Sequence, residues 1–470
     1  MEVIQQIFSY VSNLGNYIMI PIMIFIVGLV MRCKPGKALR AGITVGIGLI
    51  GLDLVMGLVW TYMSPVANLL VENFGLNLTT IDTGWATAAS LAFSTTVGAF
   101  IIPFILVVNI IMLSLHATKT MDIDIWNYWH YAFSGAIVYL LTKNIIFAFV
   151  AAALHFVISL VIADRTAKQV QEVMGLPGIS IPQGFAVTEV PIFGALEKLY
   201  NKILPKSKKE ESADTAKISQ NKVLKVLKDP IFLGLLIGSV LGFVVGYDVK
   251  NALTVGMAMA ALMFLLPRMV KVLMEGLLPI SQAAKEHMSK KYKGEEFYIG
   301  MDSAVLLGHP TTLAVGLILI PITLILAMIL PGNTTLPLAD LASTAYFVSM
   351  AAVIHHGKFG RSLVSGTVMM TIVLLIASFF APQITSFAAS GAVAIPEGAA
   401  QITALSAGNL FAFIEYWIFK LSWIGLIIAV ALIVVLVYLN RKYIKNGINE
   451  AATHVVNGNE SAVEINKETK

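Results

Sequence analysis

Long runs without charged side chains place the strongest constraint on how this chain can fold. Such runs include residues 18–31, 43–60, 97–115, 145–163, 231–245, 313–330 and 421–439, which carry no charge or nearly none. Several of them reach the roughly 17 to 25 residues that cross a lipid bilayer as an α-helix. Only 13% of the 470 residues are charged, about half the share found in a soluble domain. The pattern predicts an all-α polytopic integral membrane protein with about eleven transmembrane helices.

Lysine and arginine gather in a few segments, and their placement predicts the topology. The basic segments are 32–40, 198–229, 285–293, 355–361 and 440–445, whereas residues 66–84 and 381–415 carry acids and almost no bases. Cytoplasmic loops are enriched in Lys and Arg, so we expect the N-terminus outside, the C-terminus in the cytoplasm and an odd number of spans. The net charge of +5 is thus a topology signal, and we expect no nucleic-acid partner.

Two hydrophilic stretches divide the chain. Residues 201–229 mix lysines with acids and read as a charged cytosolic linker between a first membrane half, 1–200, and a second, 230–440. The polar residues 441–470 form a cytosolic tail that we expect to be disordered. Neither stretch has the composition of a catalytic domain.

Two segments rich in glycine and proline interrupt the apolar runs, one in each half. The first is GLPGISIPQGFAVTEVPIFG, residues 175–194, and the second is FYIGMDSAVLLGHPTTLAVG, residues 297–316. Irregular backbone at membrane depth is tolerated only where protein or a water-filled cavity satisfies its polar groups. Paired segments of this kind are typical of a midplane substrate site in a transporter. We therefore expect two re-entrant hairpins that line a pocket, with loops outside the membrane as the alternative.

Ionisable residues inside apolar runs are candidate functional groups, since burying each of them is costly. Asp302 and Glu189 lie in the two interrupted segments, and His309 follows Gly308 in the second. We expect Asp302 to bind a ligand, whereas Glu189 is equally consistent with a structural role. Asp53 and His155 are better explained by hydrogen bonds between helices.

The stretch MDIDIWNYWHYAFSG, residues 121–135, begins polar and becomes apolar. Asn127 and His130 are three residues apart and would share one helical face. Trp126, Trp129 and Tyr131 fit an aromatic belt at a membrane interface, but a belt does not require Asn127 or His130. Aromatic rings beside amides, imidazoles and carboxylates are also what a sugar or polyol site needs.

The motifs together resemble one transporter family. They are DIDIWNYWH (122–130), GISIPQG (178–184), VVGYDVK (244–250), PRMVK (267–271), EEFYIGMDSAVLLGHP (295–310) and HHGKF (355–359). This set resembles the galactitol-type membrane subunit, component IIC, of the bacterial phosphoenolpyruvate-dependent sugar phosphotransferase system. The similarity runs through nearly all of residues 1–440. The ascorbate-type subunit is more distantly similar.

The resemblance implies a fold and a mechanism. The fold would be a homodimer in the bacterial inner membrane, with eleven spans, two re-entrant hairpins, and core and scaffold portions in each protomer. Such a subunit takes a polyol or sugar from outside and presents it inside to a phosphorylated IIB protein. IIA and IIB would be separate chains here. We expect no catalytic residue, cofactor or metal in this chain, because it contains no P-loop and no metal-ligand spacing.

The resemblance also indicates site residues by position. Gln183, which follows the proline of the first hairpin, and Asp302 would bind substrate, and Trp129 and His130 fall where related transporters present pocket side chains. Galactitol-type relatives often carry His after that proline, whereas this chain has IPQG. Gln keeps a hydrogen-bonding group but does not titrate, so the exact polyol stays open.

Three other functions compete with this interpretation. A cation-coupled secondary transporter would use the same broken helices, with Asp302 or Glu189 binding H⁺ or Na⁺. A membrane enzyme would need a nucleophile or a metal site, and the adjacent His355 and His356 lack nearby carboxylates in the sequence. A membrane-bound sugar sensor would not need eleven spans.

Overall fold

The computed structural model describes residues 16–30, 32–58, 78–122, 124–175, 177–203, 230–291, 297–389 and 401–468, together with scattered positions between 61 and 73. Most of the predicted linker, residues 204–229, and the side chain of Asp53 lie outside the described residues. Helices make up most of the described chain, and the strands are only two or three residues long. The predicted all-α class is therefore confirmed.

Four of the described helices are long and apolar enough to cross a membrane. They are α6 (Thr96–Ser114), α8 (Ile145–Met174), α16 (Phe359–Phe387) and the Trp423–Asn446 part of α18 (Trp423–Glu468). Shorter apolar helices accompany them, including 249–262 and 314–329. These helices confirm a polytopic membrane protein, and the number of eleven spans stays a prediction.

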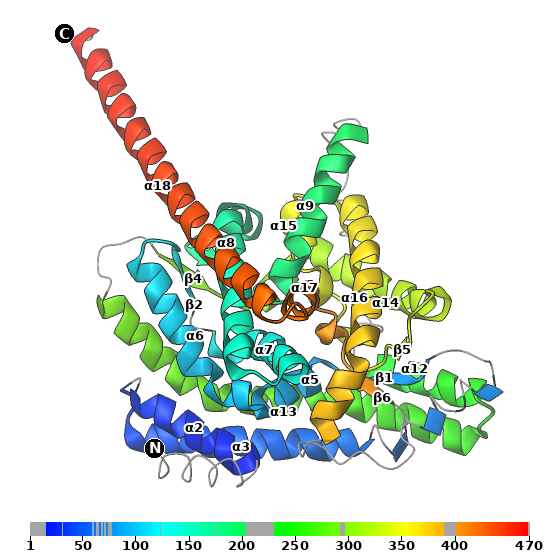
Figure 1. Cartoon of the computed structure of the whole chain (residues 1–470). Coiled ribbons are helices and arrows are strands. Elements are labelled where there is room, and N and C mark those ends of the chain that lie inside the picture. The colour runs from blue at the N-terminus through cyan, green and yellow to red at the C-terminus, as the bar shows by residue number, and fades with distance from the viewer. Residues whose placement is uncertain are drawn as a thin grey trace.

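One helical bundle combines the beginning of the chain with its middle. Helix α2 (Asn16–Val30) packs on α3 (Pro35–Leu58), α3 packs on α13 (Val249–Lys291), and α13 packs on α12 (Pro230–Val244). Small residues allow these helices to approach closely, as in many membrane proteins. A Cβ added at Gly256 of α13 would lie 2.0 Å from Ser239 Oγ of α12. Both predicted halves thus contribute to one bundle, which lies along the lower side of Figure 1.

The remaining helices pack against one another and against two small sheets. They include α5 (Trp85–Ser94), α7 (Trp129–Thr142), α9 (Ala186–Ile203), α14 (Pro310–Ile329), α15 (Ala351–Ile354) and α17 (Leu410–Phe419). Helix α7 packs on α8, and α14 packs on α16. Helix α18 packs on α8 and then projects away from the body of the protein (Figure 1).

Each sheet joins three strands that are far apart in the sequence. The first has the order β5 (Thr335–Leu336), β1 (Thr80–Asp82), β6 (Gln401–Thr403), and the second has the order β2 (Thr120–Asp122), β4 (Tyr298–Gly300), β3 (Ile179–Ser180). All pairs are parallel, with Thr80 opposite both Thr335 and Gln401, and Gly300 opposite both Asp122 and Ser180. The carboxyl ends of the three strands therefore meet at one edge of each sheet.

The two interrupted segments have the same construction. Residues 175–194 form strand β3, a turn and the start of α9, whereas residues 297–316 form β4, a 3₁₀-helix η3 (Ser303–Gly308) and the start of α14. Because β3 and β4 pair with each other, the two segments lie side by side. Their depth in a membrane stays a prediction.

Most of the predicted tail belongs to the last helix of the described chain, and the disorder of residues 441–470 stays a prediction. Helix α18 continues without interruption from Trp423 to Glu468 and includes the residues that we expect to be disordered. A nucleated helix extends at little cost in free energy per residue, so polar residues following an apolar span can continue it.

Candidate functional site

A cavity of about 140 Å³ lies where the carboxyl ends of the two sheets meet. Its lining residues follow strands β1 to β6 in the chain or begin the helices after them. They are Trp85, Trp126, Asn127, Trp129, His130, Gln183, Phe185, Asp302, Ala304, Ser343, Tyr346, Phe347 and Ser406. The rings of Trp85 and Trp126, one from each sheet, contact edge to face with centroids 6.4 Å apart. Five of the seven predicted site residues thus line one cavity.

Asp302 lies at the end of β4 and begins η3. Its Oδ1 accepts a hydrogen bond of 2.8 Å from the backbone N–H of Ala304, and its Oδ2 accepts one of 2.9 Å from Asn127 Nδ2. The same Asn127 nitrogen donates to Asp124 Oδ2 at 2.8 Å. The Asn127 amide therefore bridges two carboxylates that would otherwise repel each other. A carboxylate has about four lone-pair sites, so Asp302 retains acceptor capacity toward the cavity.

Gln183 and His130 fix each other's hydrogen-bonding roles. Gln183 Oε1 accepts the backbone N–H groups of Phe185 and Ala186 at the start of α9, at 3.1 and 2.6 Å. The amide nitrogen must therefore face His130 Nε2, 2.7 Å away, and donate to it. A neutral imidazole that accepts at Nε2 carries its proton at Nδ1. His130 Nδ1 is buried without a partner in the described structure, so the imidazole of this lining residue keeps one unused N–H donor.

Trp129 supports this arrangement. Its ring and that of His130 have centroids 3.7 Å apart, and both side chains are buried. The aromatic cluster at 126–131 therefore lies inside the protein and does not form a belt at the membrane surface.

The first sheet supplies a second wall that the sequence analysis did not identify. Ser406 follows β6, lines the cavity, and has a buried hydroxyl without a partner in the described structure. Trp85 follows β1, and Ser343 lies beyond β5. One signal was available in the sequence: TIDTGW (80–85) and TMDIDIW (120–126) both place an aspartate at a strand end shortly before a tryptophan.

Two buried aspartates hold this second wall in place. Asp82 accepts hydrogen bonds from the backbone N–H groups of Gly84, Leu338, Asp340 and Leu405. Asp340 accepts from the N–H groups of Trp85, at 2.7 Å, and Ser406, at 3.3 Å. These carboxylates are thus used to join the ends of β1, β5 and β6.

The two other predicted site residues do not line the cavity. Glu189 is fully buried in α9, where it accepts hydrogen bonds from Met350 N–H at 2.8 Å and Ser349 Oγ at 3.2 Å. His309 caps α14, because its Nδ1 accepts the Thr311 N–H at 3.2 Å. Their hydrogen bonds connect or begin helices around the site.

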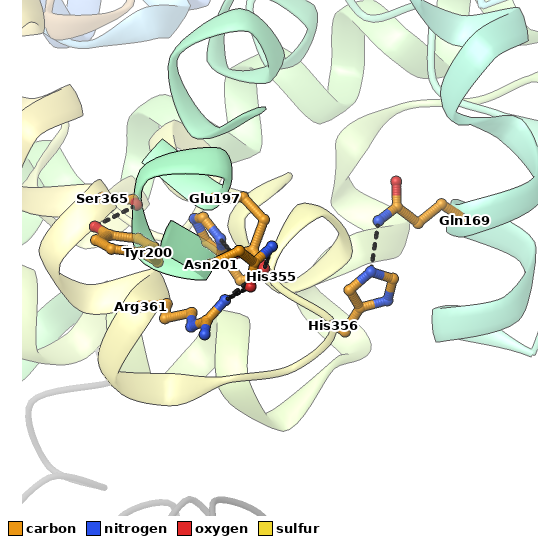
Figure 2. A network of polar contacts seen from close by, with 8 residues as sticks. All are labelled: Gln169, Glu197, Tyr200, Asn201, His355, His356, Arg361 and Ser365. Carbon is orange, nitrogen blue, oxygen red and sulfur yellow. Dashed lines mark hydrogen bonds and ion pairs between the residues drawn. The ribbon is translucent and has the colours of Figure 1, made fainter. Parts of the chain in front are cut away.

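A separate polar network joins α9 to the start of α16 (Figure 2). Glu197 accepts hydrogen bonds from Arg361 and, at 2.7 Å, from His355 Nδ1, while Arg361 also donates to Asn201. His356 faces Gln169 of α8 instead. Burial lowers the pKa of the His355 imidazole, and the Glu197 carboxylate only partly opposes this effect. Within the described residues, no group of three or more His, Cys, Asp or Glu is placed to hold a metal ion.

Comparisons with known proteins identify the family. Residues 10–398 match the family described as the PTS system sugar-specific permease component, EIIC-GAT. The chain belongs to this family. A protein of Escherichia coli K12 named "Putative permease IIC component" is 43% identical over 435 residues, which cover 93% of this chain and 99% of that protein. The galactitol-specific EIIC components of E. coli K12 and E. coli O157:H7 are each 35% identical over 373 residues, covering 79% of this chain and 82% of theirs.

Membership in the EIIC family sets the general function. The chain is the multi-pass, inner-membrane component of a sugar phosphotransferase system, and it works with IIA and IIB components on a sugar substrate. This confirms the resemblance drawn from the motifs.

Proposed function

We propose that this EIIC protein binds a galactitol-like polyol from outside and delivers it for phosphorylation by a phosphorylated IIB protein in the cytoplasm. The cavity carries this proposal, because the Asp302 carboxylate and the Gln183 amide lie in its lining together with the rings of Trp85, Trp126 and Trp129. Polyol hydroxyls donate and accept hydrogen bonds, and their C–H faces pack on aromatic rings. The relatives that are named galactitol-specific support the polyol class.

Each lining residue has a distinct role in the proposed complex. Asp302 accepts hydrogen bonds from substrate hydroxyls, and Asn127 orients its carboxylate. His130 donates through Nδ1–H, Gln183 fixes that tautomer and offers its second amide hydrogen, and Trp129 packs on the imidazole. Catalysis of phosphoryl transfer belongs to the IIB partner.

The remaining parts of the proposal concern the surroundings of the site. Glu189 and His309 support it from outside the cavity, through their hydrogen bonds to the backbone. We place the N-terminus outside and the C-terminus, with the 201–229 linker, in the cytoplasm. The functional unit is a homodimer in the lipid bilayer, and the core of each protomer moves relative to a scaffold.

Uptake and product analysis test the proposal directly. Cells expressing the chain receive radiolabelled galactitol with and without a cognate IIB. We expect phosphorylated polyol to accumulate only when IIB is present, and accumulation to be lost in Asp302→Asn and reduced in Gln183→Ala. Glu172→Gln, a change of an exposed acid on α8, is the matched control and should behave as wild type.

A cation-coupled transporter is the competing result. It would concentrate unmodified solute without IIB, and uptake would collapse with the proton or sodium gradient. The Asn127 amide lies between the Asp124 and Asp302 carboxylates, where a bound cation would need to lie. This favours binding of the polyol without a coupled cation.

A further inference from the structure

A single backbone carbonyl at the tip of the first hairpin receives two side-chain hydrogen bonds from distant helices. The carbonyl is that of Gly184, the residue after Gln183. It accepts from His155 Nε2 of α8 at 2.8 Å and from Asn409 Nδ2, at the start of α17, at 3.0 Å. Gly184, His155 and Asn409 are buried, and Gln183 is partly buried. The peptide group between Gly184 and Phe185 is therefore held from two directions.

The orientation of both donors is fixed by their other contacts. A carbonyl only accepts, so His155 carries a proton at Nε2. The Ser134 hydroxyl lies 2.7 Å from His155 Nδ1 and donates to it in the neutral ring. Asn409 Oδ1 accepts the N–H groups of Phe411 and Ala412 at 3.0 Å, which leaves its Nδ2 for Gly184.

The hairpin tip has no spare room. A Cβ added at Gly184 would lie 2.6 Å from His130 Cβ, so the Gly184 backbone packs directly on His130, a residue of the cavity lining. A shift of this peptide would move Gln183 relative to His130. It would disturb the hydrogen bond that fixes the imidazole tautomer.

We propose that His155 and Asn409 are positioning residues of the substrate site. By holding the Gly184 carbonyl they fix the Gln183 amide against His130, and so determine which donors the cavity presents to a polyol. Neither residue lines the cavity, and both act through Gln183. The inference rests on the proposed function for its ligand. The claim that His155 and Asn409 hold the Gly184 carbonyl does not depend on that function.

Substitutions at two positions separate the positioning role from helix capping and packing. Asn409→Ser keeps an N-cap oxygen, since Ser caps about as well as Asn, but loses the donor to Gly184, whereas Asn409→Ala loses both. His155→Phe keeps the ring that packs edge to face on Tyr131 and Phe411 and loses the donor. His155→Gln restores an N–H near the position of Nε2.

The first measurement is galactitol affinity of the purified full-length protein by calorimetry. We expect Asn409→Ser and His155→Phe to bind about fivefold to tenfold more weakly, the range for one lost hydrogen bond, and His155→Gln to recover part of the affinity. In a Gln183→Ala background, Asn409→Ser should have almost no further effect, because the residue that it positions is gone. An undiminished effect there would overturn the proposal.

The second measurement needs no ligand. Hydrogen exchange of the peptide covering 181–187 should be faster in Asn409→Ser and His155→Phe, while the peptide covering 298–309 exchanges as in wild type. Unchanged exchange at 181–187 would overturn the positioning role. If the wild-type protein binds no polyol, the proposed function fails, and the exchange result still decides whether these residues fix the tip.

Discussion

At the scale of single residues, the direction of one hydrogen bond decides what the cavity offers. Gln183 must donate to His130, because two backbone N–H groups occupy its oxygen. His130, a residue of the cavity lining, consequently carries an unused N–H at Nδ1 instead of a bare nitrogen. A site that hydrogen-bonds a substrate hydroxyl rejects analogues that lack it. The tautomer of His130 is therefore a determinant of specificity in the proposed complex.

Isosteric changes of His130 test this tautomer. Asn can place an amide N–H near the position of Nδ1, whereas Gln reaches the position of Nε2. We expect His130→Gln to bind galactitol about tenfold more weakly than wild type, because the Nδ1–H donor is lost. His130→Asn should retain more of the affinity, as measured by calorimetry. Tighter binding by His130→Gln than by His130→Asn would contradict the assigned tautomer.

Gly184 tests how tightly the hairpin tip is packed. Gly184→Ala introduces a methyl group 2.6 Å from His130 Cβ and 3.1 Å from the Tyr131 ring, so the backbone must shift. We expect cells that express Gly184→Ala to lose galactitol uptake. Gly194→Ala, in the helix α9 that follows Gly184, is the matched control, since no atom lies within 4 Å of the added Cβ. Equal uptake by the two variants would show that the tip tolerates displacement.

At the scale of secondary-structure elements, short parallel strands satisfy the backbone hydrogen bonds of the non-helical segments next to the cavity. A strand of two or three residues satisfies the irregular backbone of each hairpin by pairing, and its carboxyl end turns the next side chain toward the cavity. The helices that follow are anchored separately, and the Glu197 network attaches α9 to the start of α16 (Figure 2).

Glu197→Gln tests that attachment. The amide removes the charge that His355 and Arg361 share, and it leaves Arg361, which is 8% exposed, with a weaker partner. Hydrogen bonds to charged groups contribute roughly 1.5–3 kcal/mol, so we expect a lower midpoint of thermal unfolding for the detergent-solubilised protein. Galactitol affinity should change little, because none of the three residues lines the cavity. An unchanged midpoint, equal to that of Glu172→Gln, would argue against an anchoring role.

At the scale of the whole molecule, two packing regimes coexist. Around the cavity, polar groups and aromatic rings fill the space between elements. In the bundle of α2, α3, α12 and α13, small residues bring backbones into contact, and large apolar side chains such as Leu54 and Met257 are exposed. Without a hydrophobic driving force between helices in lipid, such close packing holds a membrane bundle together.

Gly256→Leu tests the bundle. The added side chain would begin 2.0 Å from Ser239 Oγ and 2.6 Å from the Leu235 carbonyl oxygen, so α12 and α13 must separate. We expect a lower yield of folded protein and a lower unfolding midpoint, measured by fluorescence-detected size-exclusion chromatography. Gly57→Leu, at an exposed position of α3 with nothing within 4 Å of its Cβ, should behave as wild type.

The sequence by itself determined the membrane class, the two interrupted segments and five residues of the cavity. A polar or aromatic residue in an apolar chain is conspicuous, because burying it is costly unless it has a partner or a ligand. Asn127, Trp129, His130, Gln183 and Asp302 were therefore found from local context and the family motifs. Their position in one cavity agrees with that reasoning.

Only the tertiary structure decided which polar groups are used by the fold and which face the cavity. Glu189 and His309 look like ligands in the sequence, but the backbone N–H of Met350, from a distant segment, occupies Glu189, and that of Thr311 occupies His309 as a helix cap. Trp85 and Ser406 are inconspicuous in the sequence, yet strands β1 and β6 pair across more than three hundred residues and bring them to the site. Hydrogen-bond partners depend on these long-range neighbours, and local sequence does not specify them.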